Sequence, residues 1–199
     1  MGHALHLGCR CGAVRLTVSA PGGSAGTRVM CYCKDCQTSA RHLRAVDMLD
    51  SAGGSDIYQT TPDRLTLRAG QDQLRIQRLS PKGLLRWYAG CCDTPLFNTL
   101  PRLGLPFVGV LIPPVQAEQA TPLIGPVVCR SFTASATPGR GAPAQDSGMA
   151  RAGLGIVTRM IAAAVSGRAR HSPLRAADGG PIAPVTVLRL EQRQAARPT

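Results

Sequence analysis

The sequence is poor in aromatic residues and in lysine, and it has no long hydrophobic run. Aromatic residues make up 4% of its 199 residues, and its basic residues are arginines apart from Lys34 and Lys82. With so few aromatic rings among its basic residues, the chain lacks the stacking platform typical of proteins that bind single-stranded nucleic acid. The longest apolar stretch, residues 153–165, is interrupted by Thr158 and Arg159. It is shorter than the roughly 18 residues that span a bilayer, so no transmembrane segment is expected.

The N-terminal residues also lack a targeting signal, because no positive segment is followed by an apolar run of about 7–15 residues. This pattern predicts a cytoplasmic protein. In that reducing compartment the eight cysteines are not expected to form disulfides. The formal charge of +12 is spread along the chain without a block of basic residues, so nucleic acid is a disfavoured partner.

Seven of the eight cysteines lie in three tight clusters. They are Cys9 and Cys11, then Cys31, Cys33 and Cys36, and then Cys91 and Cys92. Thiolates are soft, compact donors that suit tetrahedral zinc, and C-x-C or C-x-x-C spacings let one turn aim two sulfurs at one ion. A closed structural zinc site takes four protein ligands, whereas a catalytic site takes three and leaves one position open. The count therefore predicts one closed and one open Zn²⁺ site.

The spacing suggests how the cysteines divide between two ions. The second cluster supplies three sulfurs within six residues, and the first and third clusters together supply four across the fold. A histidine could instead close the second site, although a solvated surface role is more typical. The candidates are His42, His3 and His6. The lone Cys129 stands in an apolar stretch and is typical of a buried thiol.

Three motifs built on these cysteines resemble those of the glutathione-dependent formaldehyde-activating enzyme family, which includes the centromere protein V group. The motifs are G-C-R-C-G-A-V-R at 8–15, C-Y-C-K-D-C at 31–36 and C-D-T-P-L-F at 92–97. The family pattern is G-C-x-C-G-x-V-R, C-H-C-x-x-C and C-x-x-C-G-T-P-L. The resemblance implies a mainly β, zinc-stapled antiparallel β-tent. It also implies a structural zinc on the first and third motifs and a catalytic zinc at Cys31, Cys33 and Cys36, which acts on a thiol adduct of glutathione and formaldehyde as a carbon–sulfur lyase.

The chain departs from the family pattern in its second and third motifs. Ala89 stands where the third motif has its first cysteine, and Cys91 is instead adjacent to Cys92. Asp93 replaces a glycine, and Tyr32 replaces the histidine of the second motif. Either Cys91 substitutes for the lost ligand or the site is incomplete. Enzyme activity is therefore not inherited automatically, and the alternative function is a catalytically silent, zinc-stabilised binding module for protein or nucleic acid.

Alternating apolar residues predict short antiparallel strands. The segments are 13–18, 29–32, 56–59, 64–68, 74–79, 84–88 and 107–112. Residues 37–53 are expected to be helical or irregular and to form a lid over the second zinc.

Composition divides the chain into three parts. Residues 1–132 form the predicted zinc-binding β domain, and residues 133–148, rich in Ala, Pro, Gly and Ser, form a loop. Residues 149–199 form an amphipathic helix and a basic tail that pack on the β domain. The predicted apolar face holds Gly153, Ile156, Val157, Met160, Ile161, Ala164 and Val165. Gly167 ends the helix, and residues 192–199 are expected to be frayed.

Several polar residues are candidates to contact a small thiol or thiol adduct. Arginines that could meet carboxylates of the substrate are Arg41 and Arg44, and acid–base candidates are Asp47, Asp50, Asp56, Tyr32 and Tyr58. The identity of the thiol does not follow from these residues.

Overall fold

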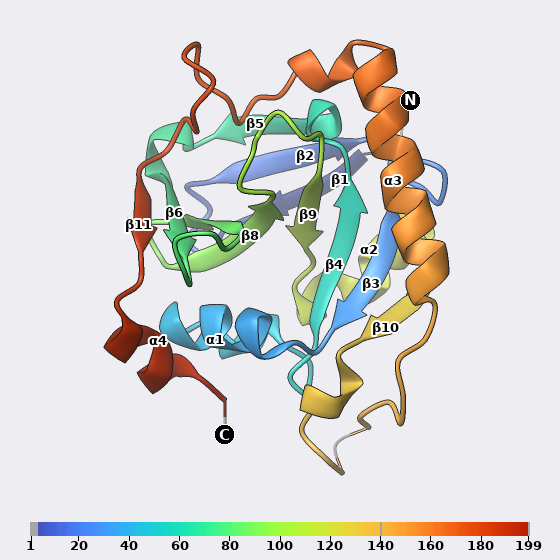
Figure 1. Ribbon diagram of the computed structural model, residues 1–199, viewed down its shortest axis with the longest axis vertical. Helices are drawn as coiled ribbons and strands as arrows, with labels where there is room; N and C mark the ends of the chain where they lie inside the picture. The colour runs from blue at the N-terminus through green and yellow to red at the C-terminus, as the bar shows by residue number, and fades with distance from the viewer. Residues whose placement is uncertain (1–3, 140, 199) are drawn as a thin grey trace.

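The computed structural model describes residues 4–139 and 141–198, which form two β-sheets and several helices. Strands β1 (Ala4–Gly8), β2 (Arg15–Ser19) and β5 (Leu65–Ala69) make a three-stranded antiparallel sheet. The strands of the larger sheet are β3 (Thr27–Cys31), β4 (Ser55–Thr60), β6 (Leu74–Arg78), β7 (Leu85–Ala89), β8 (Thr94–Thr99), β9 (Val108–Leu111), β10 (Cys129–Ser131) and β11 (Val185–Val187). Their order is β10-β3-β4-β9-β8-β7-β6-β11 (Figure 1).

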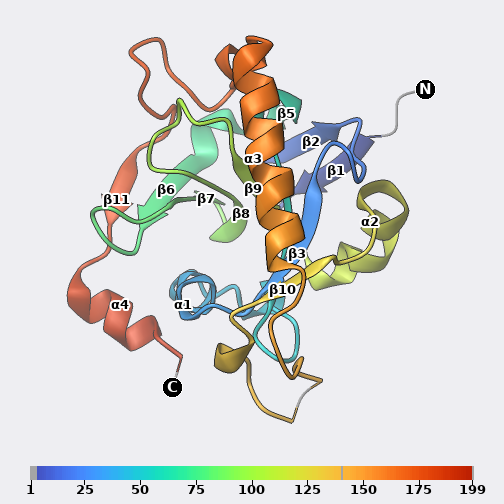
Figure 2. The same cartoon turned by 45° about the vertical axis from the view of Figure 1, so that its right-hand side comes forward.

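The α-helices are α1 (Lys34–His42), α2 (Ala117–Ile124), α3 (Met149–Val165) and α4 (Leu190–Ala196). Helix α3 runs across β10, β3 and β4, and α4 lies beside α1 (Figure 1 and Figure 2). None of the helices in the described part of the chain combines the length and the apolar content needed to cross a membrane.

The segments predicted as strands from their alternation are confirmed, since each overlaps one of β2 to β7 or β9. The prediction that all strands are antiparallel is wrong. Strand β10 pairs with β3 in parallel, and β11 pairs with β6 in parallel, so the large sheet is mixed. Both added strands are three residues long and lie at the edges, too short to show a period-2 pattern.

The main hydrophobic core fills the space between the two sheets. Trp87 and Phe97 stack there with ring centroids 5.3 Å apart, and Leu16 of the small sheet packs in the same cluster. Successive side chains of a strand point to opposite faces. Arg86 and Asn98, the sequence neighbours of the two aromatic residues, therefore lie on the outer face of the large sheet.

The C-terminal helix is confirmed, but its buried side differs from the predicted apolar face. Ala152 and Ala163 are the buried residues of α3, whereas Val157, Ile161 and Val165 are more than half exposed. Small side chains let the helix backbone approach the sheet closely, which an apolar periodicity alone does not indicate.

Two other expectations about the second half of the chain can be compared with the structure. The prediction of a frayed end is wrong, because residues 190–196 form α4 against α1. The loop at 133–148 is tied at both ends: Thr133 donates to Asp146 at 2.8 Å, and Arg130 and Ser147 exchange backbone hydrogen bonds. The domain boundaries at 132 and 148 stay a prediction.

Candidate metal centres

The four cysteines of the first and third motifs converge on one point. Cys9 and Cys11 lie in the turn between β1 and β2, and Cys91 and Cys92 lie in the turn between β7 and β8. Their Sγ atoms all lie within 4.8 Å of one another, and four of the pairs are separated by 3.3 to 3.8 Å. Sulfurs at about 2.3 Å from a tetrahedral zinc would be about 3.8 Å apart. The donor set therefore fits a four-thiolate metal ion.

Neighbouring polar groups hold this four-cysteine cluster. The Val14 backbone N–H donates to Cys9 Sγ at 3.2 Å, and Thr94 Oγ1 lies 3.1 Å from Cys92 Sγ. Burial opposes ionisation of Cys92, but hydrogen bonds from Thr94 and from the backbone of Cys11 lower its pKa to about 6. This environment favours the thiolate form of Cys92, which is the form that binds a metal ion, whereas burial and the neighbouring thiols raise the pKa of Cys91.

Cys91, whose role the motif left open, lies inside this cluster. Its Sγ is 3.3 Å from that of Cys11 and 3.8 Å from that of Cys9. We expect Cys91→Ser to lose one metal ion per chain on dialysis, as Cys92→Ser should, because a hydroxyl is a weaker zinc ligand than a thiolate. Metal analysis of the purified proteins measures this. Cys129→Ser is the control and should keep the full metal content, since Cys129 belongs to neither cluster; an unchanged metal content in Cys91→Ser would exclude Cys91 as a ligand.

The second motif forms a separate three-cysteine cluster on the outer face of the large sheet. Cys31 ends β3, Cys33 is the N-cap of α1, and Cys36 lies in the first turn of that helix. The Sγ atoms of Cys31 and Cys36 are 3.9 Å apart, and the Cys36 N–H donates to Cys33 Sγ at 3.3 Å. The expectation that residues 37–53 are helical or irregular is confirmed, although the helix begins earlier, at Lys34, and ends at His42. Their role as a lid over the second zinc stays a prediction.

No histidine or carboxylate among residues 4–139 and 141–198 completes the three-cysteine cluster. His6 lies on β1, where its Nδ1 is 3.3 Å from Thr17 Oγ1. His42 is the last residue of α1 and belongs to neither group of metal-ligating side chains. His3 is outside the described residues. The donor set fits a metal ion held by three thiolates with one position left for another ligand.

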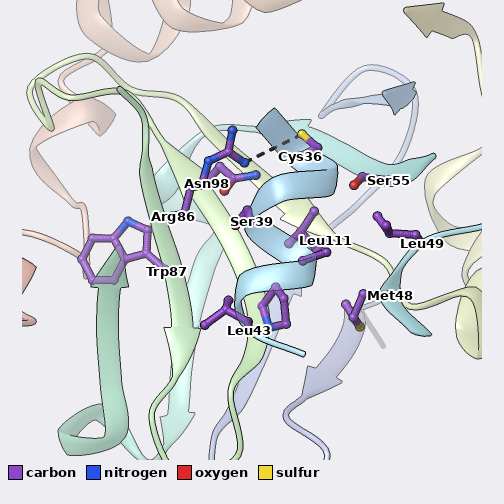
Figure 3. Close-up of a pocket in the computed structure, with 12 residues that line it drawn as sticks. Cys36, Ser39, Leu43, Met48, Leu49, Ser55, Arg86, Trp87, Asn98 and Leu111 are labelled. Carbon is purple, nitrogen blue, oxygen red and sulfur yellow. Dashed lines mark hydrogen bonds between the residues drawn. The ribbon is translucent and has the colours of Figure 1, made fainter. Parts of the chain in front are cut away.

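Arg86 is the main feature of the three-cysteine cluster that was not predicted. Its side chain is 6% exposed, and Nη1 donates to Cys36 Sγ at 3.8 Å, with Asn98 beside it (Figure 3). Hydrogen bonding with Cys31 and Cys33 holds the pKa of Cys36 well below its usual value; burial opposes this shift, and the charge of Arg86 adds to it. The positive end of the α1 dipole acts in the same direction. An arginine inside the apolar strand segment 84–88 was the only sequence signal for this role.

A pocket of about 390 Å³ opens beside the three thiols. Its wall includes Arg86 and Asn98 of the sheet, Phe132 after β10, and residues of α3. This volume is in the range of small-molecule sites. A separate cavity of about 20 Å³, with room for about one water, lies between α1 and the sheet below Cys36 (Figure 3).

Four of the acid–base candidates have structural partners. Asp56 is buried and pairs with Arg28 at 2.6 Å. Asp50 accepts a hydrogen bond from the Tyr32 hydroxyl at 3.1 Å, and burial together with Asp50 raises the pKa of Tyr32 to about 12. The Tyr58 hydroxyl bonds the backbone of residue 22. These contacts engage the four side chains in the fold, and none of the four lines the pocket.

The remaining polar candidates also lie away from the pocket. Arg41 and Arg44 are exposed and do not line it, and Asp47 is 3.9 Å from the exposed Arg10. The carboxylate that does line the pocket is Asp35, in the first turn of α1. The place of Asp35 between Cys33 and Cys36 was a signal that could have identified it.

Residues 1–186 match the model of a protein family described as "Family of unknown function (DUF6151)". No curated protein matches the sequence. Among solved structures, the chain is similar to the crystal structure of a Rhodobacter sphaeroides protein from a structural genomics programme. The two are 17% identical, the alignment covers 53% of this chain and 83% of the other, and the TM-score is 0.37.

Proposed function

This chain belongs to the DUF6151 family, a family of unknown function, and for it we propose a zinc-dependent, carbon–sulfur lyase-like activity on a small thiol adduct. One observation carries the proposal: three thiols that fit one metal ion, with no fourth ligand among the described residues, face a pocket of about 390 Å³. The motifs shared with the glutathione-dependent formaldehyde-activating enzymes support the same chemistry.

The proposed reaction is the cleavage of a thiohemiacetal into a thiol and an aldehyde. The hydroxyl proton leaves as the carbonyl forms, and the electron pair of the carbon–sulfur bond departs with the sulfur, which is then protonated. No oxidant or reductant is needed. A bound zinc would supply a positive centre that stabilises the departing thiolate.

Residues of the chain would prepare this site for the adduct. Cys31, Cys33 and Cys36 would bind the metal, and the buried guanidinium of Arg86 would balance the net charge of about −1 that three thiolates give to a divalent ion. Asp35 is positioned at the pocket to accept the hydroxyl proton of the adduct. Helix α3 would form one wall around the bound adduct.

The test uses protein loaded with two cobalt ions, whose thiolate-to-metal absorption reports ligand changes. Mild chelation should remove the ion of the three-cysteine cluster first and leave the fold intact, since that cluster joins β3 only to the adjacent helix α1. Adding glutathione with formaldehyde should change the absorption if a position is open. The matched variant is Cys33→Ser, because serine retains the N-cap of α1 while removing a thiolate.

Two results would overturn the proposal. One is an absorption spectrum that no thiol or adduct changes in the doubly loaded protein. The other is equal adduct cleavage by wild type and Cys33→Ser. Either result would favour the zinc-stabilised binding module.

A further inference from the structure

A second large pocket lies at the edge of the large sheet, next to the first residues of β3. Strand β10 pairs with only the last three residues of β3, which leaves Thr27 and Arg28 without a neighbouring strand on that side. Helices α2 and α3 lie on either side of this part of β3 (Figure 2). The space between them is a pocket of about 520 Å³, which we call the edge pocket. It shares no lining residue with the pocket beside the thiols, and its size is in the range of small-molecule sites.

Two arginines of α3, Arg151 and Arg159, line the edge pocket without a carboxylate to balance them. Arg28 lines it too, but the charge of Arg28 is balanced by Asp56 at 2.6 Å. No aspartate or glutamate of the described part of the chain lines the edge pocket. Neither Arg151 nor Arg159 forms an ion pair within residues 4–139 and 141–198. The edge pocket therefore carries two uncompensated positive charges.

Arg159 is held between the helix and the sheet with most of its hydrogen-bonding capacity unused. Its Nη2 donates to Thr27 Oγ1 at 2.5 Å, and a Cβ built on Gly155 would lie 3.1 Å from its Nη1. Burial, and to a lesser extent the charge of Arg64, lower the pKa of Arg159, as expected for a cation with no opposite charge beside it. A guanidinium has five N–H donors, and the described residues accept one hydrogen bond from this one. A bound anion would accept others.

The rest of the edge pocket offers a second charge and an apolar wall that a ligand can reach. Arg151 is exposed, and its side chain has no hydrogen-bond partner among the described residues. Pro126 and Leu154 are exposed and Val128 is half-buried, so these three side chains can contact a ligand in the edge pocket. This combination suits a molecule with an anionic group at one end and an apolar part at the other.

We infer that the edge pocket binds a phosphate monoester with an apolar body. Such a phosphate carries about −1.5 to −2 charges at pH 7, which matches two guanidinium groups, and the planar fork of arginine fits phosphate oxygens. The phosphate lies at Arg151 and Arg159, and the apolar part lies against Pro126, Val128 and Leu154. The site goes beyond the proposed function and does not depend on it, because it uses none of the residues around the three-cysteine cluster.

The first experiment compares ligands that share one apolar chain. Binding of hexyl phosphate, hexanoate and hexan-1-ol to the full-length, metal-loaded protein is measured by calorimetry. Hexyl phosphate should bind at least fivefold more tightly than hexanoate and at least tenfold more tightly than hexan-1-ol, because hydrogen bonds to charged groups are the stronger ones. Inorganic phosphate, which lacks the apolar part, should bind at least tenfold more weakly than hexyl phosphate. No binding of hexyl phosphate, or equal binding of hexanoate or hexan-1-ol, would overturn the inference.

The second experiment removes one of the two charges. Arg151→Gln should weaken hexyl phosphate binding at least fivefold and leave the melting temperature unchanged, since Arg151 is exposed and makes no contact that the fold needs. The matched control is Arg170→Gln, which changes the net charge equally at an exposed position outside the edge pocket. It should bind hexyl phosphate like wild type. Equal binding by the two variants would overturn the inference.

A third comparison adds a negative charge to the edge pocket. Thr158 lines it from an exposed position of α3, and its hydroxyl bonds only the carbonyl oxygens of its own helix. Thr158→Glu should weaken hexyl phosphate binding at least tenfold, because it places a carboxylate beside the arginines. Thr158→Gln has nearly the same shape without the charge and should bind within about twofold of wild type. Equal binding by Thr158→Glu and Thr158→Gln would overturn the inference.

Two further measurements identify where the phosphate binds and where it comes from. Cys33→Ser should bind hexyl phosphate like wild type; a loss there, with full binding by Arg151→Gln, would place the phosphate on the metal and overturn the inference. Phosphatidylcholine vesicles with and without phosphatidic acid test a lipid source. Binding to hexyl phosphate alone indicates a free ester, and binding to both hexyl phosphate and phosphatidic acid, each weakened in Arg151→Gln, indicates that a lipid headgroup can also supply it. Binding to the vesicles without binding to hexyl phosphate would overturn the inference.

Discussion

Replacing Cys9 with alanine should lower the melting temperature by roughly 10 °C or more, since a structural metal site contributes directly to the free energy of folding. Cys9 is 7% exposed, and its cluster joins the turn between β1 and β2 to the turn between β7 and β8, which lie about eighty residues apart in sequence. Losing this link removes a connection between the two sheets. A strong chelator should destabilise the wild-type protein by a similar amount. Thermal unfolding of the wild-type protein and of Cys9→Ala, each with and without the chelator, measures the effect.

Cys129→Ala is the control for this experiment. Cys129 is equally a buried thiol, at 1% exposed, but lies outside both clusters. The melting temperature of Cys129→Ala should fall on chelation as much as that of the wild-type protein, whereas the melting temperature of Cys9→Ala should fall little further. If Cys9→Ala and wild type respond alike to chelation, the four-cysteine cluster does not hold a structural metal.

Replacing Asp56 with alanine should be similarly destabilising for a different reason. Arg28 and Asp56 are both 5% exposed, and Arg28 donates to Asp56 through Nε and Nη2. The same guanidinium donates to the carbonyl oxygens of Ala117 and Gly125 and thereby anchors α2 to the large sheet. Removing one partner of a buried pair costs about 3–5 kcal/mol. For a chain of this length that corresponds to a fall of roughly 6–20 °C in melting temperature.

The matched comparison is Asp47→Ala. Asp47 pairs with Arg10 at 3.9 Å, and both side chains are largely exposed. Such pairs contribute about 0–1 kcal/mol, so this variant should unfold within a few degrees of wild type. Equal melting temperatures for Asp47→Ala and Asp56→Ala would contradict the structural role assigned to the buried pair.

The β-rich architecture could be predicted because its central strands alternate clearly. In β2, Leu16 and Val18 point to the core. The segments predicted at the positions of β4 to β7 also have apolar residues at every second position. The division of seven cysteines into groups of four and three also followed from spacing and from the family motifs. Local sequence was sufficient for the strands and for each tight cysteine cluster, because these depend on residues close together in the chain, whereas the joining of the first and third clusters came from the ligand count and the resemblance.

The edges of the large sheet and the wall of the pocket could not be predicted in this way. Strands β10 and β11 are short and join distant strands in parallel, so their pairing depends on where the preceding loops run. Arg86 reaches Cys36 only because β7 lies next to β8 in a particular register and α1 packs across that face. The apolar stripe of α3 predicted a buried face, but the small residue Ala152 decides which side meets the sheet.

The positions of these features along the chain bear on how the protein is made. A polypeptide leaves the ribosome from its N-terminus, and every clustered cysteine lies before residue 93, whereas β10 and α3 begin at residues 129 and 149. Metal ions can therefore reach both clusters on the nascent chain while the three-cysteine cluster is still uncovered. Strand β11 ends at Val187, so β6 keeps an open edge until this residue has emerged, more than one hundred residues after β6 itself. An unpaired edge invites association with other chains, so we expect the aggregation risk during synthesis to be greatest after both cysteine clusters have emerged and before β11 is in place.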